Sequence, residues 1–356
     1  MPKAPQNTTP QRGPPAAAPR LREDLAAWYR ANQRRLPWRD SPSLYKTVVS
    51  EFMLQQTQVA TVLPYFARWL EKFPDFRELA AASEAQVLKM WEGLGYYRRA
   101  RLLHALAKEL VKSQKPPSTV DGWLELPGIG PYTAAAISSI AFGVPSAVVD
   151  GNVVRVLARL LGESRRFRDG SEAAKHFTPA AQMLLNANNP GDHNQAMMEL
   201  GATVCIRRKP LCHACPFFKH CLAVARGEAE KLPRFAGKHL TQAKVKRLWV
   251  ERNGALLLHR MPAGSRRLAK VCELPNATAL HNAVIERKPF TVKRRTITTQ
   301  TFVESIHRAT FPPGAMDPAE TNPGEFLWAT PKRLERLTLS GPHRRWINAL
   351  RQSGLK

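Results

Sequence analysis

Four of the five cysteines lie close together in the chain, and their spacing constrains the fold more than any other feature. They follow the pattern C-x6-C-x2-C-x5-C at Cys205, Cys212, Cys215 and Cys221, while Cys272 stands apart. Four thiolates this close in sequence can surround one soft metal centre. Clustered cysteines, unlike the evenly spaced cysteines of a secreted disulfide scaffold, indicate a metal site in a reducing cytoplasm.

The intervals between these cysteines distinguish two kinds of centre. Zinc is the usual metal for two paired Cys-x-x-Cys knuckles. Only Cys212 and Cys215 have that spacing, and the outer intervals are longer and unequal, which suits a larger iron–sulfur cubane. We therefore predict a structural 4Fe-4S cluster. The loop between the first two ligands carries three cations suited to gripping a phosphate: Arg207, Arg208 and Lys209.

The charge indicates a polyanionic partner. The 356 residues include 54 Lys and Arg against 28 Asp and Glu, a net charge of +26. A field of this sign concentrates nucleic acid near the protein, and an anionic membrane surface is the second candidate. No apolar stretch approaches the ~20 residues of a membrane helix. We expect a cytoplasmic, nucleoid-associated monomer with no membrane partner.

The chain divides into three segments. Residues 1–20 hold six prolines, three basic residues and no acidic ones, which is typical of a disordered basic tail and not of a secretory signal. In residues 21–233, apolar positions recur at helical intervals between short turn signals. The pattern of apolar residues then changes, and residues 240–356 are expected to form a separate α+β domain.

Two strand signals and one helix signal mark this last domain. Residues 245–250 and 255–258 flank Asn253-Gly254, a strong two-strand hairpin signal. The run from Thr296 to Val303 is rich in β-branched residues and predicts another strand. Pro331 to Leu337 predicts a closing helix.

A glycine-rich string runs from Leu126 to Ala134, with the sequence L-P-G-I-G-P-Y-T-A. Gly128 and Gly130 permit positive φ and close backbone approach, and proline suits the first position of the following helix. Free amides at that helix start can hold a phosphate without reading sequence. The string is typical of a helix-hairpin-helix, although an ordinary interhelical turn would also explain a G-x-G.

Two carboxylates lie in environments that predict different protonation. Glu51 is flanked by apolar residues, which would raise its pKa and suit a general acid, although a surface glutamate on an amphipathic helix is the more ordinary interpretation of the local sequence. Asp150 ends an apolar run and precedes a helical pattern, so it would cap that helix and stay ionised. Capping alone also explains it. As a pair, one proton donor and one anion suit glycosidic-bond cleavage.

The order of these motifs resembles that of the endonuclease III superfamily of DNA glycosylases, and more closely the MutY family of adenine DNA glycosylases. The resemblance covers roughly residues 21–232. It is carried by the hairpin, the cysteines and these strings: Leu36 to Arg39, Ser50 to Val59, Gly93 to Tyr97, Val149 to Val153, and Asn194 to Gly201.

The resemblance implies a mainly α helix-hairpin-helix core of two lobes with an iron–sulfur cluster, and a C-terminal Nudix-like domain that contacts the base opposite adenine. The implied activity is hydrolysis of the N-glycosidic bond of adenine mispaired with 8-oxoguanine or guanine in double-stranded DNA. Such enzymes flip the target base out of the stack before the chemistry.

The resemblance also implies roles for individual residues. Glu51 would protonate N7 of the flipped adenine, and Asp150 would stabilise the cationic sugar. Supporting residues would be Asn152 and Tyr132. The adenine pocket would include Leu36, Trp38, Arg39, Leu54 and Gln195, and the DNA contact would include the wedge residues Gln56 and Tyr96, together with Thr57.

Position 132 separates subclasses of the superfamily. Members that also cut the strand carry a lysine there as a Schiff-base nucleophile, whereas this chain has tyrosine, which predicts a monofunctional glycosylase. Two alternatives remain: a thymine or uracil mismatch glycosylase, and a non-catalytic DNA-binding relative. The Phe-Ser-His loop tip with which the family reads 8-oxoguanine is absent, and residues 292–295 are the candidate replacement.

Overall fold

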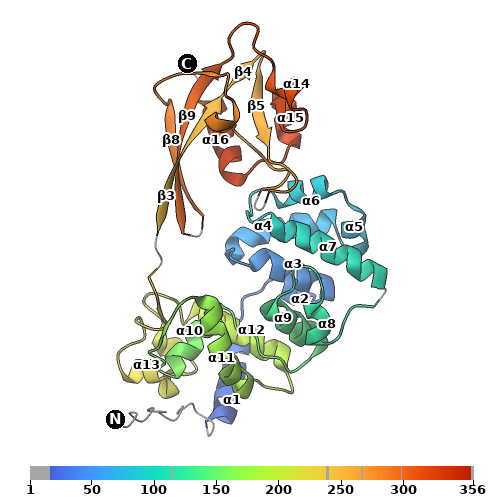
Figure 1. The fold of residues 1–356 in the computed structure, drawn as a ribbon. Coiled ribbons are helices and arrows are strands. Elements are labelled where there is room, and N and C mark those ends of the chain that lie inside the picture. Colours follow the sequence, from blue (N-terminus) through green and yellow to red (C-terminus); the bar gives the residue numbers. More distant parts are fainter. Residues whose placement is uncertain (1–16, 114, 238–239, 266–267, 298, 354–356) are drawn as a thin grey trace, which may run out of the picture. The chain divides into compact units, whose positions relative to one another are not determined.

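The computed structural model describes residues 17–113, 115–237, 240–265, 268–297 and 299–353, so the predicted tail lies mostly outside the described residues (Figure 1). The chain forms two compact units, residues 1–51 with 114–237 and residues 52–113 with 238–356. The boundary between these units runs through the predicted helical domain over 21–233, which was expected to have two lobes, and residues 52–113 are grouped with the C-terminal segment. Among the described helices, none is long and apolar enough to cross a bilayer.

The first unit is almost entirely helical, as the 3.6-residue periodicity predicts. Its first helix begins at Ala18, whereas the predicted helical domain begins at residue 21. Its elements are α1 (Ala18–Asn32), α2 (Pro37–Asp40), α3 (Leu44–Leu54, where the division into units falls after Glu51), α8 (Val120–Leu124), α9 (Pro131–Phe142), α10 (Gly151–Leu160), β1 (Arg166–Phe167), α11 (Gly170–Leu184), α12 (Pro190–Thr203), η1 (Cys212–Ala214), η2 (Phe218–His220), α13 (Leu222–Ala225) and β2 (Arg234–Phe235).

The predicted hairpin between helices is confirmed, with one correction. Gly128 has φ +77°, a conformation that favours glycine, and Pro131 occupies the first turn of α9. Gly130 caps α9 at φ −105°, so positive φ is not what requires glycine there. A Cβ built on Gly130 meets no atom within 4 Å, which leaves its outer face open to an approaching group.

The core of the first unit lies between α1, α10, α11 and α12. Its fully buried side chains include Leu21, Leu25, Leu157, Phe177 and Leu200. Each comes from the apolar stripe of its helix, and burial of a leucine or phenylalanine side chain contributes about 1.5–3 kcal/mol. This packing fixes α10 and α12, which carry several of the predicted site residues.

The second unit combines helices with two sheets. The helices of its N-terminal part are α4 (Val59–Lys72), α5 (Phe76–Ala81), α6 (Glu84–Trp91) and α7 (Arg98–Ser113). The C-terminal part contains β3 (Thr241–Trp249), β4 (Glu251–Arg252), β5 (Ala255–Arg260), β6 (Cys272–Glu273), η3 (Ala277–Ala279), β7 (Val284–Ile285), β8 (Thr291–Ile297), β9 (Gln300–Thr310), α14 (Pro318–Thr321), β10 (Phe326–Ala329), α15 (Pro331–Arg336) and α16 (Gly341–Gln352).

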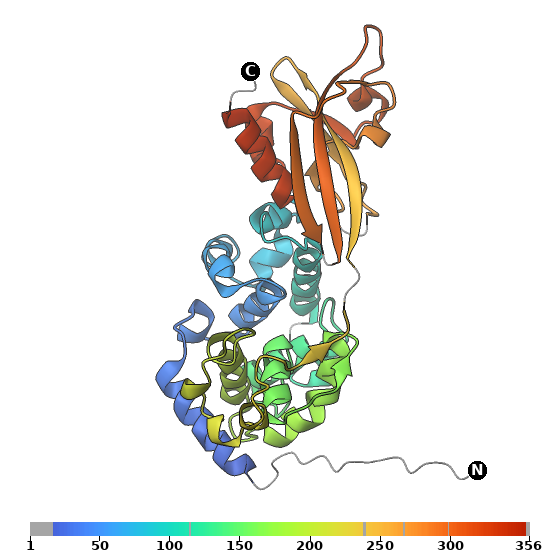
Figure 2. The same cartoon turned by 90° about the vertical axis from the view of Figure 1, so that its left-hand side faces the viewer.

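The C-terminal strands form two sheets. One has the order β10-β5-β4, with β6 on β5, and the other has β3-β9-β7, with β8 on β9. Helix α16 lies along one face of the long strands β3, β8 and β9, and Ile347 packs in the same cluster as Ile306 of β9 (Figure 2). The predicted helix from Pro331 is confirmed as α15.

Two strand predictions need correction. The Asn253-Gly254 turn does join an antiparallel pair, with φ of +50° and +74°, but the partner of β5 is the short β4. The predicted partner, residues 245–250, lies largely in β3, which runs parallel to β9 in the other sheet.

The run from Thr296 to Val303 is not one strand. It contains the end of β8 and the start of β9, which pair antiparallel from Ile297 and Gln300 onward. No glycine, proline or asparagine lies between Thr296 and Val303, so the β-branched run concealed the division into two strands. The suggested recognition segment, residues 292–295, therefore lies inside β8 and not at a loop tip.

Candidate active site

Glu51 and Tyr132 form the centre of the candidate site in the first unit. Glu51 lies in α3 and is 6% exposed, and its Oε2 accepts a hydrogen bond of 2.7 Å from the Tyr132 hydroxyl. Burial raises the pKa of Glu51 to about 7, against the opposing effect of the Tyr132 hydrogen bond. The ambiguity over Glu51 is thereby reduced, because this glutamate is buried and can hold a proton near neutrality.

Asp150 caps α10, as predicted. One carboxylate oxygen accepts from the Val153 amide and the other from the Asn152 side-chain amide, both at 2.8 Å. Burial nevertheless raises the pKa of Asp150, and these two hydrogen bonds act in the opposite direction. The expectation that the helix end alone would keep Asp150 ionised is therefore incomplete, because the pKa of both carboxyls is raised.

The two carboxyls are close enough to interact. The negative charge of Asp150 contributes to the raised pKa of Glu51 and of Tyr132, after the larger effect of burial. Two neighbouring carboxyls in a buried setting favour a state in which only one is ionised. Asp150 has two donors to its carboxylate and Glu51 has one, so the negative charge is better stabilised on Asp150.

A series of hydrogen bonds supports the side chain of Asp150. Arg155 donates to the Asn152 side-chain oxygen at 2.9 Å and to the Cys205 carbonyl at 2.6 Å. Helix α12 approaches Asn152 so closely that a Cβ on Gly201 would lie 2.6 Å from the Asn152 Cβ. The position of Asp150 therefore depends on α12 and on the start of the cysteine loop.

The predicted pocket residues of the first unit fall into an apolar and a polar group. Leu36 and Trp38 are buried, with 4% and 8% exposure. Arg39 donates through Nε to Gln195 Oε1 at 3.1 Å and through Nη2 to Glu199 Oε2 at 3.0 Å. The structure thus brings the predicted Arg39 and Gln195 together.

Sequence reasoning missed Glu199 and Arg34. Glu199 is fully buried in α12 and also pairs with Arg34, through Oε1 at 2.6 Å and Oε2 at 2.9 Å. Burial acts to raise the pKa of Glu199, but the Arg34 hydrogen bond and the Arg39 charge hold it below its usual value. The available signal was a glutamate within the apolar face of a helix, where a carboxylate needs a cationic partner.

The predicted wedge residues lie in the second unit, in conformations that non-glycine residues rarely adopt. Gln56 has φ +56° and Tyr96 has φ +49°, and Tyr96 is 46% exposed. Such outliers persist only where the surroundings impose them, and they cluster at functional sites. Leu54 and Thr57 lie in the same segment as Gln56.

Arg99, which the sequence did not single out, connects the two wedge segments. Its guanidinium is buried and donates to the carbonyls of Phe52 and Met53 at 2.9 and 3.0 Å, and to Thr57 Oγ1 at 3.1 Å. It also lies over the Tyr96 ring, 5.5 Å from the ring centroid. Arg99 therefore holds both exposed segments from the interior.

The four predicted cysteine ligands line one pocket in the first unit, together with Arg159 and Phe217. No group of three or more His, Cys, Asp or Glu side chains among the described residues is arranged to hold a metal ion. Arg159 is buried and donates to Cys205 Sγ at 3.3 Å and to the carbonyls of Ile206 and Arg207 at 2.8 and 3.1 Å. The loop's cations, Arg207, Arg208 and Lys209, are exposed.

Known proteins similar to this chain act on DNA. A family model described as the HhH-GPD superfamily base excision DNA repair protein matches residues 49–180. The solved structure of a thermostable thymine-DNA glycosylase has a TM-score of 0.51 and 26% identity, covering 59% of this chain and 99% of that one.

Curated relatives give a narrower assignment. An adenine DNA glycosylase of Rattus norvegicus is 44% identical over 229 residues, covering 60% of this chain but only 44% of that protein, so the chain spans less than half of that relative's length. The adenine DNA glycosylase of Mycolicibacterium smegmatis is 39% identical over 222 residues, covering 60% of this chain and 74% of that protein. With a match over most of that bacterial relative, the chain belongs to the adenine DNA glycosylase family within the helix-hairpin-helix base excision repair superfamily.

Proposed function

We propose that this protein is a monofunctional DNA glycosylase that removes adenine paired with 8-oxoguanine or guanine. The observation that carries the proposal is the buried Glu51, with a pKa of about 7, hydrogen-bonded to Tyr132 and electrostatically coupled to Asp150. A group that is partly protonated at neutral pH is suited to general-acid catalysis. Family membership supports adenine as the base.

In this mechanism Glu51 donates its proton to N7 of the flipped adenine, which makes the base a better leaving group. As the N-glycosidic bond breaks, the sugar acquires cationic character, and the carboxylate of Asp150 stabilises it. Asn152 and Val153 hold that carboxylate through their hydrogen bonds. Glu51, now ionised, accepts a proton from the attacking water.

Base recognition in this proposal involves the polar group around Glu199. Arg39 is held by Glu199 and Gln195, and these two contacts fix the direction in which the other N–H groups of its guanidinium point. The buried Leu36 and Trp38 provide apolar surface for the adenine ring. Leu54, in the second unit, remains a predicted pocket residue on the resemblance alone.

DNA binding would involve several separate elements. The amides around Gly128 and Gly130, with Arg207, Arg208 and Lys209, are suited to backbone phosphates. Gln56 and Tyr96 would fill the gap left by the flipped base, and Thr57 would lie beside them at the DNA contact. Binding should weaken steeply with salt, because each phosphate contact releases counterions.

The four cysteines fit an iron–sulfur cluster better than a zinc ion. Their unequal spacing differs from that of two paired zinc knuckles, and their side chains line a common pocket. Cys205, Cys212, Cys215 and Cys221 would hold a 4Fe-4S cluster, which supplies a structural cross-link for the loop that they enclose. Iron content and a broad visible absorption band, as opposed to zinc content, test this assignment.

The C-terminal domain would be Nudix-like and contact the base opposite adenine. Its candidate recognition element is now the β8–β9 hairpin as a whole, because residues 292–295 lie within a strand. Arg295 is engaged by Glu273 at 3.1 Å, so Lys293 and Arg294 are the cations of this run left for DNA. The protein would act as a monomer on the nucleoid.

A second candidate is thymine or uracil mismatch repair, because the fold is similar to that of a thymine-DNA glycosylase. Base release from duplexes with adenine opposite 8-oxoguanine, guanine, thymine and cytosine, with G·T and G·U duplexes as controls, separates the two activities. Release of adenine is expected, and release of thymine or uracil alone would overturn the proposal. Borohydride should trap little covalent protein–DNA adduct, because Tyr132 replaces the lysine nucleophile.

A further inference from the structure

Two adjacent tyrosines in the loop from Gly93 to Tyr97 have opposite environments. Tyr96 is 46% exposed in a left-handed conformation, whereas Tyr97 is 1% exposed. The Tyr97 hydroxyl donates a 2.7 Å hydrogen bond to the carbonyl of Leu339 in the C-terminal domain. The loop therefore presents one ring outward and is attached to a distant part of the chain through the other.

An ion pair joins the same two segments. Arg344 contacts both carboxylate oxygens of Glu92, at 2.5 and 3.2 Å, and the Glu92 side chain is largely buried. Arg344 also donates to the Leu337 carbonyl, which accepts a 3.2 Å hydrogen bond from Lys89 as well. A bidentate, shielded arginine–carboxylate contact is stronger than an exposed surface pair.

The backbones also meet at glycines. A Cβ built on Gly341 would lie 3.7 Å from the Cα of Gly93, so the start of α16 rests against the loop. On another side, a Cβ on Gly93 would lie 2.0 Å from the Tyr65 hydroxyl, and φ at Gly93 is +107°. The loop is therefore confined by α4 and by the C-terminal domain.

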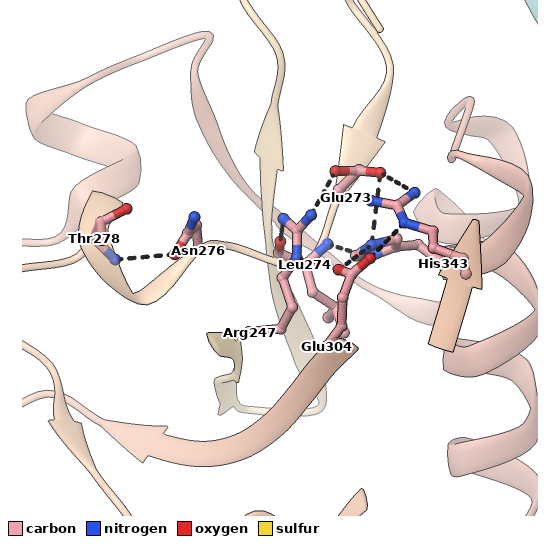
Figure 3. Close-up of polar contacts among 8 residues, drawn as sticks. Arg247, Glu273, Leu274, Asn276, Thr278, Glu304 and His343 are labelled. Carbon is pink, nitrogen blue, oxygen red and sulfur yellow. Dashed lines mark hydrogen bonds and ion pairs between the residues drawn. The ribbon is translucent and has the colours of Figure 1, made fainter. Parts of the chain in front are cut away.

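The segment from Leu337 to Arg344 is itself held firmly. The Ser340 amide donates to the Cys272 carbonyl at 3.1 Å, and the Leu274 amide donates to His343 Nδ1 at 2.9 Å. Figure 3 shows His343 beside the carboxylates of Glu273 and Glu304.

This buried network extends to the long strands β3, β8 and β9 of the sheet. Arg247 of β3 pairs with Glu273 at 3.0 Å and with Glu304 at 2.6 Å (Figure 3). Arg295 of β8 also pairs with Glu273. Burial acts to raise the pKa of Glu273, but the neighbouring cationic groups, Arg247 and Arg295 among them, bring it to about 2. The carboxylates of Glu273 and Glu304 therefore stay ionised at neutral pH, and the network connects the β8–β9 hairpin to the Leu337–Arg344 segment.

We propose that the Leu337–Arg344 segment positions the Gly93–Tyr97 loop, so that Tyr96 is presented for insertion before DNA arrives. Glu92, Tyr97 and Arg344 are then positioning residues that act through Tyr96. The inference rests on the proposed role of Tyr96 as a wedge. Its physical benefit is that the ordering of the loop is already complete, which lowers the conformational cost of entering the duplex.

The test uses Glu92→Gln, Tyr97→Phe and the double variant of the full chain, with Glu251→Gln as the matched control. Glu251 forms an exposed ion pair with Arg351 at 3.7 Å in the same domain, away from the loop. Hydrogen exchange of the peptide covering residues 92–97 is measured without DNA. We expect roughly tenfold faster exchange in the double variant, with each lost hydrogen bond contributing, and no change in the control.

The second measurement uses a duplex with 2-aminopurine in place of the target adenine, at saturating protein. The fluorescence increase that reports unstacking should fall in the double variant while the melting temperature stays near that of the parent. The proposal would be overturned if the peptide exchanged at the parent's rate in the double variant. It would also be overturned if exchange became faster but the 2-aminopurine fluorescence increased as much as with the parent. If the parent protein releases no adenine, the proposed function fails, but the exchange measurement still decides the attachment of the loop.

Discussion

Replacing Glu51 by glutamine is expected to stabilise the folded protein at alkaline pH and to abolish base release. Glu51 is 6% exposed, and burial raises its pKa from 4.5 to about 7. At about 1.4 kcal/mol per pH unit, this gap corresponds to about 3 kcal/mol of stability lost when Glu51 must ionise. The glutamine side chain carries no charge and can still accept the Tyr132 hydrogen bond.

The direction of this pH-dependent stability difference follows from the raised pKa of Glu51. Below pH 4.5 both the folded and the unfolded chain hold the Glu51 proton, so the parent and Glu51→Gln should have similar stability. Between pH 4.5 and 7 only the unfolded state releases the proton, and the parent loses stability as pH rises. Above pH 7 the folded state ionises too, and the difference of about 3 kcal/mol levels off.

Urea unfolding at pH 4 and pH 8 measures this difference. Glu125→Gln, at an exposed position of the same unit, serves as the control and should show the same stability change at both pH values. A Glu51→Gln advantage that is equal at both pH values would refute the raised pKa. Unchanged base release by this variant, with DNA binding retained, would refute its role as proton donor.

Three further substitutions test other contacts of the site. Tyr132→Phe removes the hydroxyl that lowers the pKa of Glu51, so the pH above which single-turnover base release declines should rise by about one unit; a downward move contradicts this. Asp150→Asn should slow base release by about 10²–10³-fold without weakening DNA binding, and a rate close to the parent's would exclude Asp150 as the electrostatic stabiliser. Arg99→Met removes donors to buried carbonyls and should cost about 3 kcal/mol in unfolding experiments, whereas unchanged stability would mean that these hydrogen bonds contribute little.

Local sequence signals predicted the elements that are determined locally. The cap at Asp150, the proline at the start of α9 and the Asn253-Gly254 turn each depend on residues a few positions apart, and each is present. The β8–β9 turn was missed because its residues carry no turn preference of their own. The run is divided by the pairing of β8 with β9, and pairing between strands is not a local property.

The site residues that were missed owe their roles to distant partners. Glu199 and Arg34 are far apart in sequence, and either alone is an ordinary charged residue on a helix or loop. Arg99 lies in a basic helix start, where an exposed arginine is the usual expectation, yet it is buried among carbonyls. Only tertiary packing distinguishes these side chains from their exposed neighbours.

The contacts of Arg155 connect the cysteine loop to the candidate active site, a link that the position of the loop in the sequence does not suggest. Arg155 joins the Cys205 carbonyl to Asn152, and Asn152 donates to the carboxylate of Asp150. A loop that lost its cross-link would release that carbonyl and, with it, the orientation of the Asn152 amide. In the proposed mechanism, the Asp150 carboxylate stabilises the cationic sugar only at close range and in fixed geometry. A cluster with a purely structural role would then still be needed for base release.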